Sequence, residues 1–137
     1  MALEKSYTME NGITCANAYC VISNVVQQKR MADEPDPDGI RPEGTPDHTW
    51  RAGVYGRISV AVYADQNART SGRAPIASYA QYPTDVIAGS HTTEVNLCDG
   101  EDTMWFTIDT DPSAASVTDQ AYAHLLTLPA FSDAVDV

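Results

Sequence analysis

The feature that most constrains the fold is an alternation of apolar residues in the stretch GRISVAVYAD, residues 56–65. Its β-branched residues Ile58, Val60 and Val62 lie two positions apart and share one side of an extended chain. A period of two with β-branched side chains is typical of a strand that places one face on a core. The pattern therefore predicts a β-strand in this stretch.

Further strand patterns lie on both sides of it. Asn11-Gly12 predicts a hairpin, because the favoured two-residue turn needs positive φ at both central positions. Beyond that turn, alternation places Tyr19, Val21 and Val25 on one face of a second strand. Strands are also expected at residues 76–82, which would pair with the first pattern, and at 91–98 and 103–109. Asp99-Gly100 predicts a hairpin between the last two.

A single helix is expected near the end of the chain. Ser116 or Thr118 can cap its start, Asp119 complements the helix dipole, and Pro129 ends it. Its apolar face consists of Val117, Ala121, Leu125 and Leu128. The segment that follows, residues 130–137, keeps Phe131 and Val135 among acidic residues, which indicates a tail laid on the sheet or on a neighbouring subunit.

Residues 29–53 have a different composition, because they are rich in proline, glycine and carboxylates. The prolines at 35, 37, 42 and 46 argue against a regular element and predict a long loop, with Trp50 as the residue that could anchor it. Within it, Glu34, Asp36 and Asp38 have the spacing that opens a calcium loop. Thr45 stands where such a loop needs a bidentate acid, so we interpret the segment as a solvated acidic loop.

These patterns together predict one domain over residues 1–137. The fold class that they favour is mainly β, a β-sandwich or a small barrel-like antiparallel sheet, with one C-terminal α-helix. An α+β fold is the alternative. A chain of 137 residues is long enough for one modest core.

Charge narrows the functional classes. Nineteen acidic and eight basic residues leave a net charge of -11, and the basic residues are scattered. Such a surface repels nucleic-acid phosphates and anionic lipids, and it favours solubility or a basic partner. No apolar run reaches the roughly 20 residues of a membrane span. We therefore expect neither nucleic acid nor a membrane as partner.

No motif in the chain indicates a reaction. Cys15, Cys20 and Cys98 form no C-x-x-C pair, which argues against zinc and favours reduced, half-buried thiols, although a bridge from Cys98 to one of the others stays open. The histidines His48, His91 and His124 are far apart in the sequence. Nucleophile elbows and phosphate loops are absent. We predict that the protein is not an enzyme and needs no metal or other cofactor.

The aromatic residues offer a different class of function. A sugar-binding platform is one interpretation of the set, and packing across a sheet is the other. The residues concerned are Tyr55, Tyr63, Tyr79, Tyr82, Trp105 and Phe106. Exposure on one face would favour the platform.

Both ends of the chain resemble a group of small tailed-bacteriophage proteins encoded near tail and fibre genes. SYTMENGITCANAYCVI matches their Asn-Gly hairpin, and AYAHLLTLPAFSDAVD matches an ending of the form A-Y-x-H-L-x-T-L-P-x-F-x-x-A-x-D. The ending falls on Ala121, Tyr122, His124, Leu125, Thr127, Leu128, Pro129, Phe131, Ala134 and Asp136. Residues 29–53 depart from the group's pattern. The resemblance implies a structural role in a virion or its tail.

From the resemblance we expect a virion structural protein of the tail, baseplate or fibre-attachment region, assembled in the cytoplasm of the bacterial host. A capsid-decorating protein and a carbohydrate-binding host-surface module are the alternatives. Its partners would be other virion proteins and copies of itself, in a homo-oligomer or a symmetric hetero-assembly. The predicted interface residues are Trp50, Tyr122, Leu125, Leu128, Phe131 and Val135.

Overall fold

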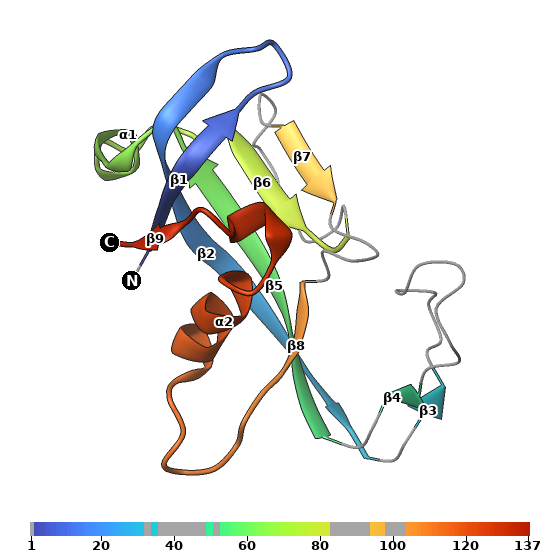
Figure 1. Cartoon of the computed structure of the whole chain (residues 1–137). Coiled ribbons are helices and arrows are strands. Elements are labelled where there is room, and N and C mark those ends of the chain that lie inside the picture. The colour runs from blue at the N-terminus through green and yellow to red at the C-terminus, as the bar shows by residue number, and fades with distance from the viewer. Residues whose placement is uncertain (1, 32–33, 36–48, 51–52, 83–93, 98–103) are drawn as a thin grey trace.

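A computed structural model describes residues 2–31, 34–35, 49–50, 53–82, 94–97 and 104–137 of the chain (Figure 1). The main sheet contains β1 (Leu3–Thr8), β2 (Thr14–Arg30), β5 (Gly53–Tyr63), β6 (Ala77–Ala80), β7 (Glu94–Leu97), β8 (Trp105–Thr107) and β9 (Val135–Asp136). The helical elements are α1 (Gln66–Thr70), α2 (Val117–Leu125) and the 3-10 turn η2 (Pro129–Phe131). The predicted mainly β fold with a C-terminal helix is confirmed.

The sheet order is β7-β6-β5-β2-β1-β9, and every pair is antiparallel except β6 with β7. β6 pairs with residues 60–62 of β5, whereas β8 pairs with residues 55–57, so both occupy the same edge of β5. The predicted hairpin between residues 91–98 and 103–109 is therefore wrong, since β7 and β8 pair with different strands. Within the described residues the architecture is one main sheet packed against α2, not a sandwich of two large sheets.

The central strand behaves as its alternation predicts. Ile58, Val60 and Val62 of β5 are all buried on the face of the sheet that α2 covers. We call this the inner face and the opposite one the outer face. Gly56 also belongs to this strand. A β-carbon at Gly56 would lie 2.4 Å from the ring of Phe106, which is closer than real β-carbons approach other atoms. Only glycine lets this aromatic side chain pack against the strand.

The Asn11-Gly12 hairpin forms, but with a different turn from the one predicted. Gly12 has φ of 88°, and no other residue of the turn has positive φ. The Gly12 N–H donates to the Met9 carbonyl, and the Met9 N–H donates to the Ile13 carbonyl. This is a type I turn followed by a glycine bulge, which needs only one left-handed residue.

A bulge in β2 overturns part of the predicted face assignment. The register with β5 shifts between Ile22 and Asn24, so Ser23 is an extra residue. Val25 then lies opposite Ile58 on the inner face, and not beside Tyr19 and Val21 as simple alternation predicts. One inserted residue exchanges the faces of every residue that follows.

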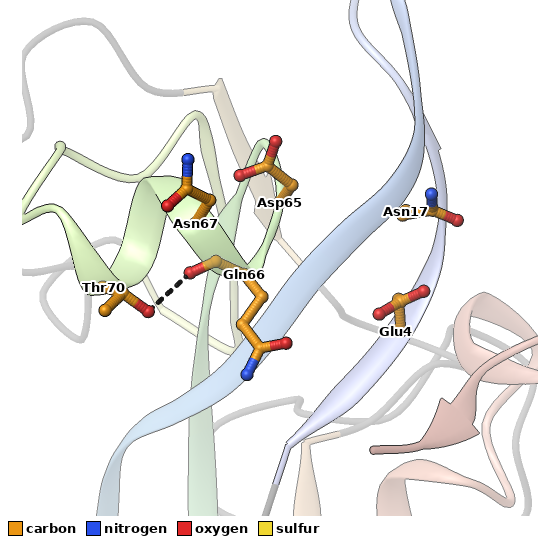
Figure 2. A pocket seen from close by; sticks show the side chains of 6 residues that line it. All are labelled: Glu4, Asn17, Asp65, Gln66, Asn67 and Thr70. Carbon is orange, nitrogen blue, oxygen red and sulfur yellow. Dashed lines mark hydrogen bonds between the residues drawn. The ribbon is translucent and has the colours of Figure 1, made fainter.

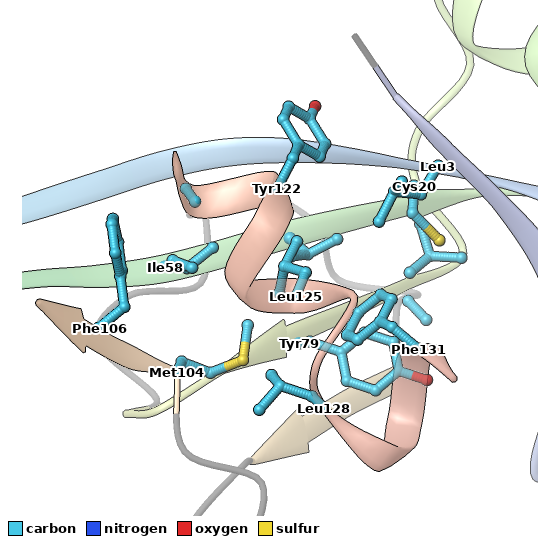
Figure 3. Packing of buried hydrophobic residues seen from close by; sticks show 14 of the residues in the cluster. Leu3, Cys20, Ile58, Tyr79, Met104, Phe106, Tyr122, Leu125, Leu128 and Phe131 are labelled. Atoms are coloured by element: carbon cyan, nitrogen blue, oxygen red, sulfur yellow. The ribbon is translucent and has the colours of Figure 1, made fainter. Parts of the chain in front are cut away.

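The C-terminal helix follows its sequence signals. The Ser116 hydroxyl accepts a hydrogen bond from the Asp119 N–H at 3.1 Å and so caps α2. Ala121, Tyr122 and Leu125 are buried in the core cluster. Figure 3 shows Tyr122 and Leu125 in this cluster. The helix ends earlier than predicted, so Leu128 lies in the turn beyond it, and Pro129 begins η2.

The sheet curls around this core. The Tyr7 hydroxyl of β1 donates to the Glu94 carboxylate at 2.7 Å and accepts from the Asn96 amide at 2.9 Å. The Glu10 N–H also donates to Glu94. β1 and β7 are separated by three strands in the sheet order, so these side-chain bridges require strong curvature. Among the described residues no backbone pairing closes the curve into a barrel.

Two connections contain more structure than predicted. β2 extends to Arg30 and pairs with β5 as far as Gly53, and the backbones of β3 (Glu34–Pro35) and β4 (Thr49–Trp50) form a short separate ladder. The helix α1 occupies the segment expected to be a polar connection. Asp65 caps it, because its carboxylate accepts from the Ala68 N–H at 2.7 Å. Most of the calcium-like stretch lies outside the described residues.

Candidate functional site

The predicted interface residues do not lie together on the surface. Four of the six are core residues of the chain itself, namely Tyr122, Leu125, Leu128 and Phe131, each no more than 5% exposed. They are buried because α2 and η2 supply the layer that covers the inner face of the sheet (Figure 3). In this conformation these four side chains are unavailable to a partner, which corrects their prediction as docking residues.

Tyr122 has a specific role at the β2 bulge. The Ile22 N–H lies beyond the end of β1, which pairs with β2 only as far as Cys20, and the Tyr122 hydroxyl accepts this N–H at 3.1 Å. The Ser23 hydroxyl donates to the Ser59 carbonyl at 3.1 Å on the opposite strand. Backbone groups beside the bulge are thus bonded by the Tyr122 side chain of α2 and the Ser23 side chain of β2.

Lys5 fixes the end of the chain to the sheet. Its ammonium group donates to the Ala130 carbonyl and lies 5.1 Å from the ring centroid of Phe131 and 5.6 Å from that of Tyr79. A cation over two aromatic rings combines electrostatic attraction with packing of the lysine stem. The tail therefore lies back on its own sheet, one of the two arrangements that the sequence suggested.

Val135 is the predicted interface residue that the structure leaves exposed, at 58%. It lies in β9, which pairs with β1 through Leu3 and Glu4 and forms the end of the sheet order. The outer edge of β9 has no strand partner among the described residues. Val137 is 54% exposed beside it, and its N–H donates to the Ala2 carbonyl. For Trp50, the structure describes the backbone only.

The six aromatic residues do not form a single exposed platform. Tyr79 and Phe106 belong to the inner core, whereas Tyr55 and Trp105 are buried together on the outer face with Tyr82 beside them. The Arg57 guanidinium lies 4.9 Å from the Tyr82 ring and 5.2 Å from the Trp105 ring. Packing across the sheet accounts for these contacts.

A polar pocket lies where α1 meets the β1–β2 hairpin (Figure 2). We call it the α1 pocket. It is open to solvent and has a volume of about 450 Å³. Its lining residues are Glu4, Asn17, Asp65, Gln66, Asn67 and Thr70. The site has no motif in the sequence, because its residues come from three separate segments. The one available signal was Asp65, a helix N-cap ahead of QNART.

The titratable side chains of the core are held neutral. Burial raises the pKa of the Cys20 thiol to about 12, with the Lys5 ammonium acting in the opposite direction and the Asp133 carboxylate adding to the rise. Burial also raises the pKa of Tyr7 to about 12, and the Glu94 carboxylate, which accepts a hydrogen bond from the Tyr7 hydroxyl, adds to this rise. A thiol protonated at neutral pH is a poor nucleophile.

The other chemically versatile residues form no centre in the described part of the chain. Cys15 and Cys20 are free thiols, and His124 stacks on Phe106 at 5.7 Å between ring centroids. No three side chains of the metal-binding types gather there. Cys98, His48 and His91 lie outside the described residues.

Comparisons with family models, curated proteins and solved structures find no match to this chain. No helix among the described residues is long and apolar enough to cross a membrane.

Proposed function

We propose that this chain is a structural protein of a tailed-bacteriophage particle, located in the tail, baseplate or fibre-attachment region. In this proposal it acts by docking on a neighbouring protein through the outer edge of β9. The support for the location is the resemblance of both chain ends to small tail-associated phage proteins. The support for the mode of action is the shape and charge of the described surface.

The observation that carries the docking surface is the exposure of Val135 and Val137 on the outermost strand. Val135 lies opposite Glu4, and Glu4 lies opposite Tyr19, so the exposed valines belong to the outer face of the sheet. An edge strand offers unpaired backbone donors and acceptors to an extended segment of another chain. Two exposed valines give that added strand an apolar contact.

Charge favours a basic neighbour over a second copy of this chain. Asp133 and Asp136 flank Val135 and are exposed, and the chain as a whole carries -11. Two copies meeting at this edge would bring like charges together, whereas a basic segment would be attracted to it. The occupant that we propose is therefore an extended basic segment of another virion protein.

The test needs a variant that leaves the core intact. Deleting residues 130–137 is unsuitable because Phe131 is fully buried. Val135→Lys instead places a charge on the docking edge, and Ile13→Lys is its matched control, because Ile13 is also 58% exposed but lies on the hairpin turn. Each variant is supplied during infection by a phage whose own copy of the gene is deleted, and purified particles are analysed by quantitative mass spectrometry.

We expect Ile13→Lys to be incorporated at the parental level and Val135→Lys to be lost from particles, with the two variants melting within a few degrees of each other. Incorporation of Val135→Lys at the parental level would contradict docking through β9. Absence of the parent protein from purified particles would contradict the virion assignment. Its presence on tail-less heads would replace the tail assignment with capsid decoration.

A further inference from the structure

We propose that the α1 pocket binds a neutral saccharide. The site belongs to a different part of the surface from the docking edge, and the inference does not depend on the proposed virion role. It rests on unused hydrogen-bonding groups in the pocket, a bulge in its wall, an adjoining aromatic pair and the sign of its charge.

The pocket contains polar side chains that the protein itself does not use. The carboxylate of Glu4 and the amides of Asn17, Gln66 and Asn67 make no hydrogen bond within the described residues. By contrast, Asp65 caps α1 and the Thr70 hydroxyl donates to the Gln66 carbonyl (Figure 2). Each amide offers donors and an acceptor, which matches a hydroxyl group that both donates and accepts. Several such groups facing one cavity suit a polyhydroxylated ligand.

The strands that form one wall of the pocket contain a β-bulge. The β1–β2 register shifts between Lys5 and Tyr7, so that Ala16 and Asn17 of β2 both lie opposite Ser6. A bulge of this kind redirects side chains, and bulges are frequent beside binding sites. Here it lies beside Asn17, which lines the pocket on the hairpin side, across from α1 (Figure 2).

An aromatic pair adjoins the polar groups on the outer face. Glu4 lies opposite Tyr19, and Tyr19 lies opposite Tyr63 on the next strand. Both tyrosines are half-buried, and the Arg69 guanidinium of α1 lies 5.4 Å from the Tyr63 ring centroid. Neither tyrosine is among the lining residues of the pocket, but Tyr19 is the cross-strand neighbour of the lining residue Glu4, so a sugar that extends past Glu4 can stack on its ring. Amphipathic rings beside hydrogen-bonding side chains provide the two kinds of contact that a sugar ring needs.

The charge of the pocket and the number of metal-binding side chains in it restrict the chemical class of molecule that it can bind. Glu4 and Asp65 make the pocket acidic, which disfavours phosphorylated and other anionic ligands. A metal ion is disfavoured because no three metal-binding side chains gather in the described part of the chain. A neutral saccharide satisfies both restrictions, and about 450 Å³ falls within the range of small-ligand sites.

The inference is tested by NMR titration of the isotopically labelled full chain with maltotriose, mannotriose and galactotriose, each in a separate series. We expect at least one of them to give saturable shifts of backbone amides at residues 4, 17 and 65–70, with a Kd of about 1 mM. Parallel titrations use calcium chloride and sialyllactose, which we expect to leave these amides unchanged.

Asn17→Ala tests the pocket directly, and Asn24→Ala is its matched control, because Asn24 is an exposed asparagine on the same strand outside the pocket. We expect Asn17→Ala to weaken binding about tenfold, as for the loss of a good hydrogen bond, and Asn24→Ala to have no effect. The inference is overturned if none of the three sugars gives saturable shifts, if Asn17→Ala binds like the parent, or if only calcium or sialyllactose binds.

Discussion

Individual polar groups decide how α2 is attached to the sheet. Tyr122 is 2% exposed, and its hydroxyl accepts the Ile22 N–H, which lies beyond the end of β1. The sequence places Tyr122 among the predicted interface residues but gives no sign of this bond. The bond depends on where the pairing of β1 with β2 ends, which the local pattern of β2 does not contain.

Tyr122→Phe removes this hydroxyl while keeping the ring. We expect the free energy of unfolding, measured by urea denaturation, to fall by about 1 kcal/mol, because the Ile22 N–H loses its partner. Tyr63→Phe is the control, since its hydroxyl makes no hydrogen bond with the described residues. Equal stability of the two variants would show that the Tyr122 hydroxyl contributes nothing.

Cys20 makes stability depend on pH in the alkaline range. Burial raises its pKa from 9.0 to about 12, so the folded chain retains a proton that the unfolded chain releases. The contribution of Cys20 to the free energy of unfolding is complete below pH 9. It is lost as the pH rises from 9 toward 12, because the unfolded state then binds fewer protons than the folded state.

We therefore expect the free energy of unfolding of the parent to decrease between about pH 9 and 10, before the buried tyrosines contribute. Cys20→Ala should flatten this slope. Val62→Ala, which truncates the residue opposite Cys20, should lower stability at every pH and keep the slope. Parallel slopes for the parent and Cys20→Ala would contradict the assignment.

At the scale of elements, the C-terminal segment is the part of the fold that completes the core. Ala121, Tyr122 and Leu125 on α2, Leu128 after it and Phe131 in η2 are all buried on the inner face. β9 then pairs with β1 beside the N-terminus (Figure 1). Packing in the core accounts for Tyr122, Leu125, Leu128 and Phe131 of this ending.

Phe131→Ala measures how much the core depends on this segment. We expect a loss of about 3 to 5 kcal/mol in the free energy of unfolding, as for a large aromatic side chain removed from a closed core. Leu126→Ala, at a helix-end leucine that is 41% exposed, should cost less than about 1 kcal/mol. Comparable losses from the two variants in chemical denaturation would argue against the central position of Phe131.

Elements with strong local signals were predicted correctly, and so was the pairing of β6 with β5, whereas the partners of β7 and β8 were not. The β5 alternation, the glycine of the first hairpin and the Ser116 cap are local features whose physical requirements are visible in the sequence. The parallel pairing of β7 with β6 and the separate pairing of β8 with β5 depend on which distant edges are available. The α1 pocket was missed for the same reason, because Glu4, Asn17 and Asp65 meet only after folding.

For the whole molecule, the main consequence of the fold is that the core, the exposed β9 edge and the α1 pocket lie on different parts of the sheet. The inner face holds the core, the β9 edge exposes Val135 and Val137 beside two aspartates, and the α1 pocket lies on the outer face. The sequence predicted an acidic protein with apolar groups near its end, but it could not distinguish buried Phe131 from exposed Val135. That distinction depends on how the sheet curls over α2, which is a property of the complete chain.

The central claim, docking of the β9 edge on a basic neighbour in a phage particle, is tested most directly by cryo-electron microscopy of the native particle. The map should contain the curled sheet, with an extended basic segment of a different protein paired along the outer edge of β9 and contacting Val135. A map in which this edge faces solvent, or in which the chain has no density, would contradict the claim.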